Sequence, residues 1–214
     1  MNTETIIDVL AIGGIAIYPL LLLGIIMTVI LLDKAIVHRR YGRLPESLNR
    51  LVENFGFDWK TFHEEVRKLR QGNFYRRFFI AIHENHTRPA WWVESRAGDE
   101  ARVIEKEMNQ GLWALETIVT AAPLIGLLGT IIGMMNAFKI IGVNGLTKPE
   151  QVTGGVAQAL VATALGLLVA LIALFGFNYF SRRNALLMDD MERLGTRAID
   201  HIRLDQEENR SAAA

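Results

Sequence analysis

The sequence predicts an all-α membrane protein with three transmembrane helices, the second and third extended into the cytoplasm as long helices, and a helical cytoplasmic insert. Half of the 214 residues are hydrophobic, and they gather in three long blocks that are almost free of charge. Each block exceeds the roughly 20 apolar residues that a helix needs to cross a bilayer. We expect a first segment and span (1–37), an insert (38–110), a second span (111–139), a periplasmic loop (140–154), a third span (155–181) and a cytoplasmic tail (182–214).

The composition excludes some classes of protein. The chain has 23 basic and 23 acidic residues, whereas nucleic-acid binding needs a surplus of Lys and Arg. It has no cysteine, so disulfides and thiolate metal sites are excluded. We therefore expect membrane lipids, and no nucleic acid, among its partners.

The first uncharged block runs from Val9 to Leu32. A cleaved signal peptide has basic residues before its apolar stretch, whereas this chain has Glu4 and Asp8 there. We therefore expect the block to remain as the first span.

Basic residues beside the spans predict the orientation, because Lys and Arg gather on the cytoplasmic side. The N-terminus and the connection between the second and third spans carry few of them. The other flanks carry Lys34, Arg39, Arg40, Arg43, Arg102, Lys106, Arg182 and Arg183. The N-terminus is therefore expected in the periplasm, and the insert and C-terminal tail in the cytoplasm.

The insert shows the usual signals of helix ends. Asp58 and Asn73 are typical N-cap residues, and Gly56 and Gly72 are typical stops. Short helices are expected near 46–55, 59–70 and 74–86.

Two longer apolar seams extend beyond the spans at three-four spacing. One precedes the second span and is weakened only by Gly111, and the other follows the third span and is weakened only by Gly195. Their members are Val93, Ala97, Ala101, Ile104, Met108, Leu112 and Leu115, and then Leu187, Met191, Leu194, Ala198 and Ile202. Such seams need partners, which are either each other or further copies of the chain, and we expect a homo-oligomer.

The second span contains a polar stripe. At about 100° per residue, Thr120 and Thr130 each fall within about 40° of Glu116. Pro123 lies between them and frees a backbone carbonyl that a hydroxyl or water must satisfy. Small residues line a nearby face: Ala122, Gly126, Gly129, Gly133 and Ala137.

The third block, from Gly155 to Phe180, has no charge and one small face, formed by Gly155, Ala159, Thr163, Gly166, Ala170 and Ala173. Small faces in membrane helices mark close helix contact, and a hydroxyl among them either bonds across that contact or lines a polar path. Both interpretations stay open for Thr130 and Thr163.

Other chemical groups give weaker signals. His83, Glu84 and His86 form the only ligand-like set, but their spacing is not that of a metalloenzyme helix, so we expect a solvated helix face. No nucleophile and base pair or phosphate loop is visible. We therefore expect no enzyme activity, no metal and no cofactor.

Two segments carry a family resemblance. The stretches Ala122 to Met134 (APLIGLLGTIIGM) and Gly155 to Ala170 (GVAQALVATALGLLVA) resemble the paired signature of the ExbB/TolQ/MotA proton-channel family. The first-span stretch Tyr18 to Leu23 (YPLLLL) is similar to the ExbB and TolQ branch, so the resemblance covers all three spans.

The resemblance implies a stator and channel subunit of a motor in the bacterial inner membrane, driven by the proton motive force. In such complexes five copies form a ring around the single spans of two ExbD-like partners, and the motion passes to a TonB-like protein that serves outer-membrane transporters. The pore-facing threonines of the family match Thr130 and Thr163. A partner aspartate would carry the proton.

One position departs from the family. ExbB and TolQ commonly have a glutamate five residues before the second threonine, where this chain has Gln158. An amide cannot titrate but can hydrogen-bond. Glu116 is either a proton exit group or a carboxylate paired with a nearby Lys or Arg. Gln158, Glu116 and Thr120 are thus candidate pathway or partner contacts, and Pro123 and the small residues are candidate packing positions.

Two alternatives stay open. A Tol-type or gliding-type motor would have the same membrane motifs, because the partner's periplasmic domain sets the task. A non-conducting membrane scaffold would use the small faces for packing alone.

Overall fold

The computed structural model describes residues 14–54, 57–144 and 149–212, and within these ranges the chain forms helices and no strand. The helices are α2 (Ile17–Tyr41), α3 (Glu46–Glu53), α4 (Trp59–Lys68), α5 (Phe74–His83), α6 (Ala90–Asn109), α7 (Leu112–Asn144) and α8 (Pro149–Ala212). Stretches long and apolar enough to cross a membrane lie within Ile17–Tyr41, Ala90–Lys139 and Thr153–Ala212. The predicted all-α fold with three spans is therefore confirmed.

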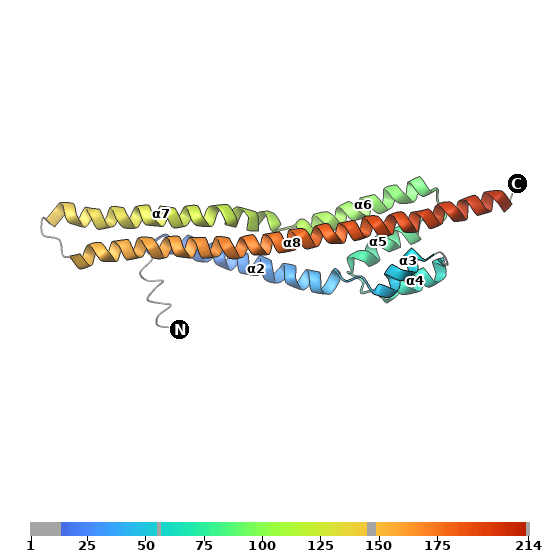
Figure 1. Ribbon diagram of the computed structural model, residues 1–214, viewed down its shortest axis with the longest axis horizontal. Coiled ribbons are helices and arrows are strands. Elements are labelled where there is room, and N and C mark those ends of the chain that lie inside the picture. Colours follow the sequence, from blue (N-terminus) through green and yellow to red (C-terminus); the bar gives the residue numbers. More distant parts are fainter. Residues whose placement is uncertain (1–13, 55–56, 145–148, 213–214) are drawn as a thin grey trace. The chain divides into compact units, whose positions relative to one another are not determined.

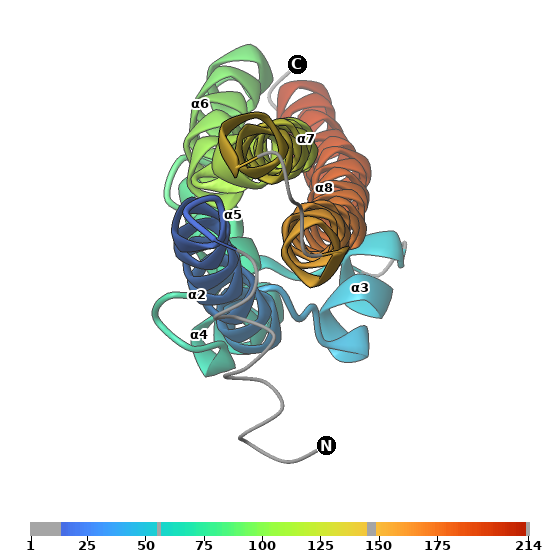
Figure 2. The ribbon, with the colours of Figure 1, turned by 90° about the vertical axis from the view of Figure 1, so that its left-hand side faces the viewer.

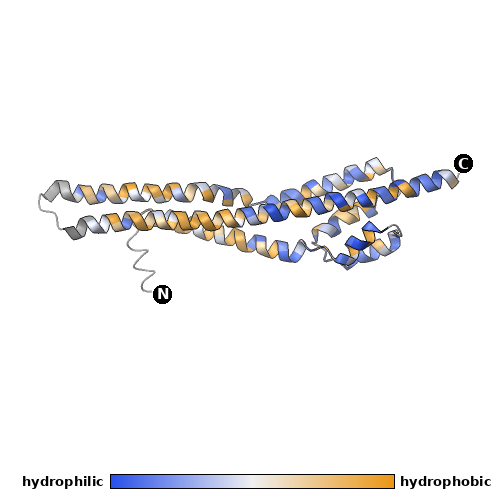
Figure 3. Ribbon diagram, in the orientation of Figure 1, coloured by the Kyte–Doolittle hydropathy of each residue, from blue (hydrophilic) through white to orange (hydrophobic). Residues whose placement is uncertain are grey.

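The chain divides into two compact units. The apolar unit consists of Met1–Leu32 and Gly111–Tyr179, and so contains the first part of α2, α7 and the first part of α8. Figures 1 and 2 show α7 beside this part of α8, running in the opposite direction. Figure 3 shows that both are largely hydrophobic. Residues 9–13 of the predicted first span lie outside the described residues.

The polar unit consists of Asp33–Gln110 and Phe180–Ala214 and has its own apolar core. Helices α3 to α6 and the second part of α8 supply the core, and Phe62, Phe79 and Leu194 are among its fully buried side chains. Both predicted seams enter it: the buried members are Val93, Ala97, Ile104 and Met108 of α6, and Leu187, Met191, Leu194, Ala198 and Ile202 of α8. The two long helices therefore partner each other within one chain.

The two predicted N-caps of the polar unit are confirmed. The Asp58 carboxylate accepts hydrogen bonds from the backbone N–H groups of Lys60 and Thr61, and the Asn73 side-chain oxygen accepts from those of Tyr75 and Arg76. Each cap satisfies donors that a helix start leaves unpaired, which stabilises a helix by about 1 kcal/mol.

Gly111 interrupts the helix that the seam predicted to run from Ala90 into the second span. Helix α6 ends at Asn109 and α7 begins at Leu112, and Gly111 has a φ of 84°. Glycine adopts such a φ at little cost because it has no Cβ. The second span and its extension are thus two helices joined at Gly111, whereas α8 continues through Gly195 without a break.

The helices extend into the range 140–154, which the sequence analysis assigned to a loop. Helix α7 continues to Asn144, because no proline intervenes, and α8 begins at Pro149. A proline suits the first turn of a helix, where its missing N–H would have no partner. Residues 145–148 of the predicted loop lie outside the described residues.

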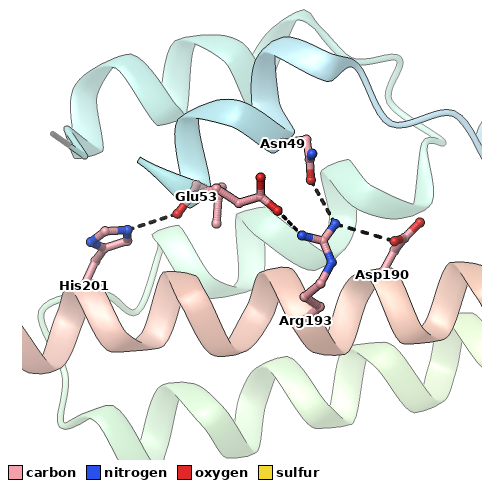
Figure 4. Close-up of polar contacts among 6 residues, drawn as sticks. Asn49, Glu53, Asp190, Arg193 and His201 are labelled. Carbon is pink, nitrogen blue, oxygen red and sulfur yellow. Dashed lines mark hydrogen bonds and ion pairs between the residues drawn. The ribbon is translucent and has the colours of Figure 1, made fainter. Parts of the chain in front are cut away.

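A polar cluster holds α3 against α8 within the polar unit (Figure 4). Arg193 pairs with Glu53, donates to the side-chain oxygen of Asn49 at 3.0 Å and lies 3.6 Å from Asp190. The His201 Nε2 lies 3.1 Å from a backbone carbonyl oxygen of α3. Exposed ion pairs add little stability individually, so the cluster serves mainly to set the position of α3 along α8.

Candidate proton pathway in the apolar unit

Helices α7 and α8 approach so closely that their backbones touch. A Cβ atom added at Gly166 would lie 2.6 Å from the Ala122 carbonyl oxygen and 3.1 Å from the Gly126 Cα. One added at Gly126 would lie 3.0 Å from the Ala162 carbonyl oxygen and 3.1 Å from the Thr163 Cα. Membrane helices associate through such close packing, since lipid offers no hydrophobic drive between them.

The close packing continues along both helices. A Cβ at Gly133 would lie 3.0 Å from the Ala159 Cβ, and one at Gly155 would lie 2.8 Å from the Ala137 Cβ. Pro123 lies inside α7 without ending it. Of the candidate packing residues, the following are buried: Gly126, Gly129, Gly133, Ala159, Gly166 and Ala170.

Gly129 brings the start of the first span into the same packing. A Cβ there would lie 2.6 Å from the Ala162 Cβ and 2.9 Å from the Ala16 Cβ. Ala16, just before α2, is itself buried. The small faces of the second and third spans thus meet within one chain, with Ala16 beside them.

The Thr163 hydroxyl bonds across this contact. It donates to the Gly126 carbonyl oxygen at 3.1 Å, and the side chain is partly buried. The hydroxyl therefore joins α8 to α7. Since its one proton is used in this bond, its oxygen can still accept a hydrogen bond but cannot donate another.

The Thr130 hydroxyl bonds within its own helix. It donates to the Leu127 carbonyl oxygen at 2.6 Å, which is the back-bonding that threonine often makes in helices. Thr130 also lines an open depression along α7 with Ile131, Met134 and Phe138. The two hydroxyls therefore use the consecutive carbonyls of residues 126 and 127, and both keep only acceptor capacity.

Glu116 and Thr120 lie on the exposed surface of α7. Thr120 donates to the Thr117 carbonyl oxygen at 3.0 Å. Among the described residues, no Lys or Arg forms an ion pair with the Glu116 carboxylate. Among the described residues, neither Glu116 nor Thr120 forms a hydrogen bond with Thr130 or Thr163.

Gln158 lies against the start of the first span. A Cβ at Gly14 would lie 1.6 Å from the Gln158 side-chain nitrogen, and Gly14 has a φ of 64°. The Gln158 amide therefore covers the backbone of Gly14. This position agrees with the helical wheel, which sets Gln158 about 140° from Thr163.

Three histidines of the insert, His63, His83 and His86, form an aromatic stack in the polar unit. The His83 ring stacks on His63 at 4.3 Å between centroids and on His86 at 5.1 Å, and Trp59 stacks on His86 at 4.8 Å. Burial, then the nearby His63 and His86, lower the pKa of His83. The described residues hold no group of three His, Asp or Glu side chains placed for a metal ion. Instead of a solvated face, the histidines form part of a stack.

The polar unit contains a buried polar layer that was not predicted from the sequence. Lys34 is 4% exposed and donates to the Met108 carbonyl oxygen at 3.0 Å. The Asn184 amide is 3% exposed and donates to the side-chain oxygen of Asn109 at 2.8 Å. One sequence signal could have predicted part of this layer. Asn184 lies three residues before Leu187, so it continues the seam of α8 and is expected on the same buried face.

Comparisons with known proteins point to one family. The family described as the MotA/TolQ/ExbB proton channel family matches residues 70–193, more than half of the chain. A "Biopolymer transport protein ExbB" of Aquifex aeolicus is 40% identical over 80 residues, which cover 37% of this chain and 54% of that protein. The chain thus spans about half the length of this relative.

Two further relatives align over more of their length. The "Biopolymer transport protein ExbB" of Helicobacter pylori is 34% identical over 104 residues, covering 49% of this chain and 72% of that protein. A "Putative biopolymer transport protein ExbB-like 1" of Synechocystis is 28% identical over 207 residues, covering 91% of this chain and 78% of that protein. With the family match over α6, α7 and the membrane part of α8, the chain belongs to the MotA/TolQ/ExbB proton channel family.

Proposed function

We propose that this chain is the channel wall and stator of a motor in the bacterial inner membrane. Copies of the chain, five by the family resemblance, would surround the single spans of two ExbD-like partners. The proton motive force would drive the partner, and a TonB-like protein would pass the motion to outer-membrane transporters. The N-terminus would lie in the periplasm, and the polar unit in the cytoplasm.

The joined pair of α7 and α8 carries this proposal. Backbone contact and the bond from Thr163 to Gly126 make the pair a stiff wall, as a stator requires. Thr130 and Thr163 present acceptor oxygens, which suit an O–H donor such as a protonated carboxyl group. The two threonines would therefore stabilise the protonated partner aspartate without titrating themselves.

The energy available is adequate for such a motor. One unit charge that crosses 100 mV releases about 2.3 kcal/mol, enough to bias two conformations about fifty-fold. Charge in a membrane needs polar groups where it pauses. The two threonines supply such groups, and Glu116 is the proposed exit group at one end of α7.

Valine substitutions test the proposal, because valine keeps the shape of threonine and lacks the hydroxyl. Thr130→Val and Thr163→Val should assemble with the ExbD-like partner but abolish partner-dependent proton uptake into proteoliposomes. Thr28→Val is the matched control, since Thr28 also bonds back to its own helix, at 2.7 Å from the Gly24 carbonyl oxygen. Normal flux in both test variants would refute the pore assignment. For the exit group, undiminished flux in Glu116→Gln would refute its role.

A non-conducting scaffold is the second candidate, because the Thr163 hydroxyl is already bonded within the chain. A scaffold predicts unchanged function in the valine variants, while bulky residues at Gly129 or Gly166 break assembly. Within the motor class, the ExbB names of the relatives favour the TonB-type system over a Tol-type or gliding-type system.

A further inference from the structure

A basic pocket lies at the end of α2 in the polar unit. It is open and has a volume of about 600 Å³. Its basic residues are Arg39 and Arg40 of α2, Arg43 just after α2, Lys68 at the end of α4 and Arg70 just after α4, and the other lining residues are Ile36, Pro45, Leu69 and Asn73. Five of these side chains are cations and none is a carboxylate. The pocket is therefore suited to an anion.

Buried contacts set the shape of this pocket. Asn73 is 4% exposed, caps α5 with its oxygen and donates from its nitrogen to the Arg43 carbonyl oxygen at 2.9 Å. A Cβ at Gly72 would lie 2.5 Å from the Tyr41 ring. The end of α2 is thus tied to the turn before α5, and Arg43 and Arg70 are brought to one pocket.

The cations of the pocket are largely uncommitted. Lys68 pairs with Glu65. Arg39, Arg40, Arg43 and Arg70 form no ion pair with any described residue. Guanidinium groups bind phosphate oxygens through paired N–H donors, so this set favours a phosphate group.

The position along α2 identifies the kind of phosphate. The uncharged stretch of α2 ends at Leu32, and Arg39 follows seven residues later, which is about 10 Å along a helix. The headgroup layer extends about 5–7 Å beyond the apolar core of a bilayer, so the long Arg39 side chain can reach back from this position to the headgroup phosphates. Ile36 lines the pocket one turn closer to the uncharged stretch of α2 than Arg39 does, is 57% exposed and can contact an acyl chain.

We propose that this pocket binds the headgroup phosphate of an anionic phospholipid. The site would hold a lipid against the α2 end and the turn before α5. It depends on α2 being a span and not on proton conduction, so it can fail or hold independently of the proposed function.

The test uses the full chain in detergent, titrated with dioleoyl phosphatidylglycerol, with bound lipid counted by native mass spectrometry. Each Lys or Arg at an anionic surface strengthens binding about fivefold, so Arg43→Gln with Arg70→Gln should weaken it about 30-fold. Arg43→Lys with Arg70→Lys should recover most of the loss. The matched control, Arg67→Gln with Arg197→Gln, removes two exposed arginines outside the pocket and should change binding less than twofold.

Several outcomes would overturn the proposal. If the control pair of substitutions weakened lipid binding equally, the lipid would be attracted by the overall positive charge and not by this pocket. Dioleoyl phosphatidylcholine binding as tightly would remove the preference for anionic lipid. Inorganic phosphate or polyglutamate that displaces the lipid at equal concentration would identify a free anion or an acidic protein segment as the ligand.

Discussion

An alanine at Gly166 would force α7 and α8 apart, because the added Cβ would meet backbone atoms and not a movable side chain. It would lie 2.6 Å from the Ala122 carbonyl oxygen and 3.1 Å from the Gly126 Cα. Ordinary van der Waals contact begins at about 3.4 Å. The two backbones would therefore have to separate by about 0.8 Å.

This separation has two energetic consequences. Overpacking of a close contact costs about 1–3 kcal/mol. The bond from Thr163 to Gly126, at 3.1 Å, would lengthen beyond hydrogen-bonding range, and such a bond contributes about 0.6 kcal/mol in a membrane. The better helix propensity of alanine returns at most about 1 kcal/mol. We expect a net loss of about 1–3 kcal/mol.

The measurement is the free energy of unfolding of the purified chain in mixed micelles, from a titration with dodecyl sulfate followed by circular dichroism. Gly154→Ala is the matched control, since Gly154 lies in the same helix and nothing lies within 4 Å of a Cβ there. The control should keep or slightly raise stability. Equal unfolding free energies for the two variants would refute the packing argument.

Three further predictions concern single side chains. Burial and the neighbouring histidines lower the pKa of His83, so the unfolded chain binds a proton at this side chain more readily than the folded chain does. The thermal midpoint should therefore fall as pH drops below about 6.5. His83→Phe removes the titrating group and should flatten this pH dependence. Asn73→Ala removes a cap and the bond to Arg43, and should lower the unfolding free energy by about 1–2 kcal/mol, whereas the exposed Asn54→Ala should have little effect. If Thr163 accepts a bond from the protonated partner acid, Thr163→Val should shift carbodiimide labelling of that acid to lower pH; an unchanged labelling profile would contradict this role.

Features that depend on a few neighbouring residues were predictable from the sequence. Asp58 and Asn73 cap the helices that follow them because a cap needs only the side chain and the next turn. The spans were predictable because length and hydrophobicity alone decide whether a helix can cross a bilayer. The seams of α6 and α8 were predictable as buried faces, since helical periodicity places their members on one side.

Features that depend on the pairing of distant segments were not predictable. Both small faces were visible, but the partner of Thr163 is Gly126, 37 residues earlier in the chain, and this pairing depends on the register between α7 and α8. The position of Gln158 over Gly14 depends on where the first helix begins. At Gly111, the seam favoured a continuous helix, and only the structure reveals the positive φ that ends α6.

The register of α7 and α8 bears directly on the polar groups of the proposed pathway. Because Gly126 and Gly166 allow backbone contact, the Thr163 hydroxyl reaches a carbonyl oxygen of the neighbouring helix and donates its hydrogen bond there. The Thr130 hydroxyl donates its hydrogen bond to the next carbonyl oxygen along α7, that of Leu127. A pathway lined by these two side chains would offer oxygen acceptors and no titrating group, since Gln158 is an amide turned toward Gly14. A proton that moves past them must therefore arrive on a donor from another chain or on water, and the valine variants distinguish this requirement from simple packing.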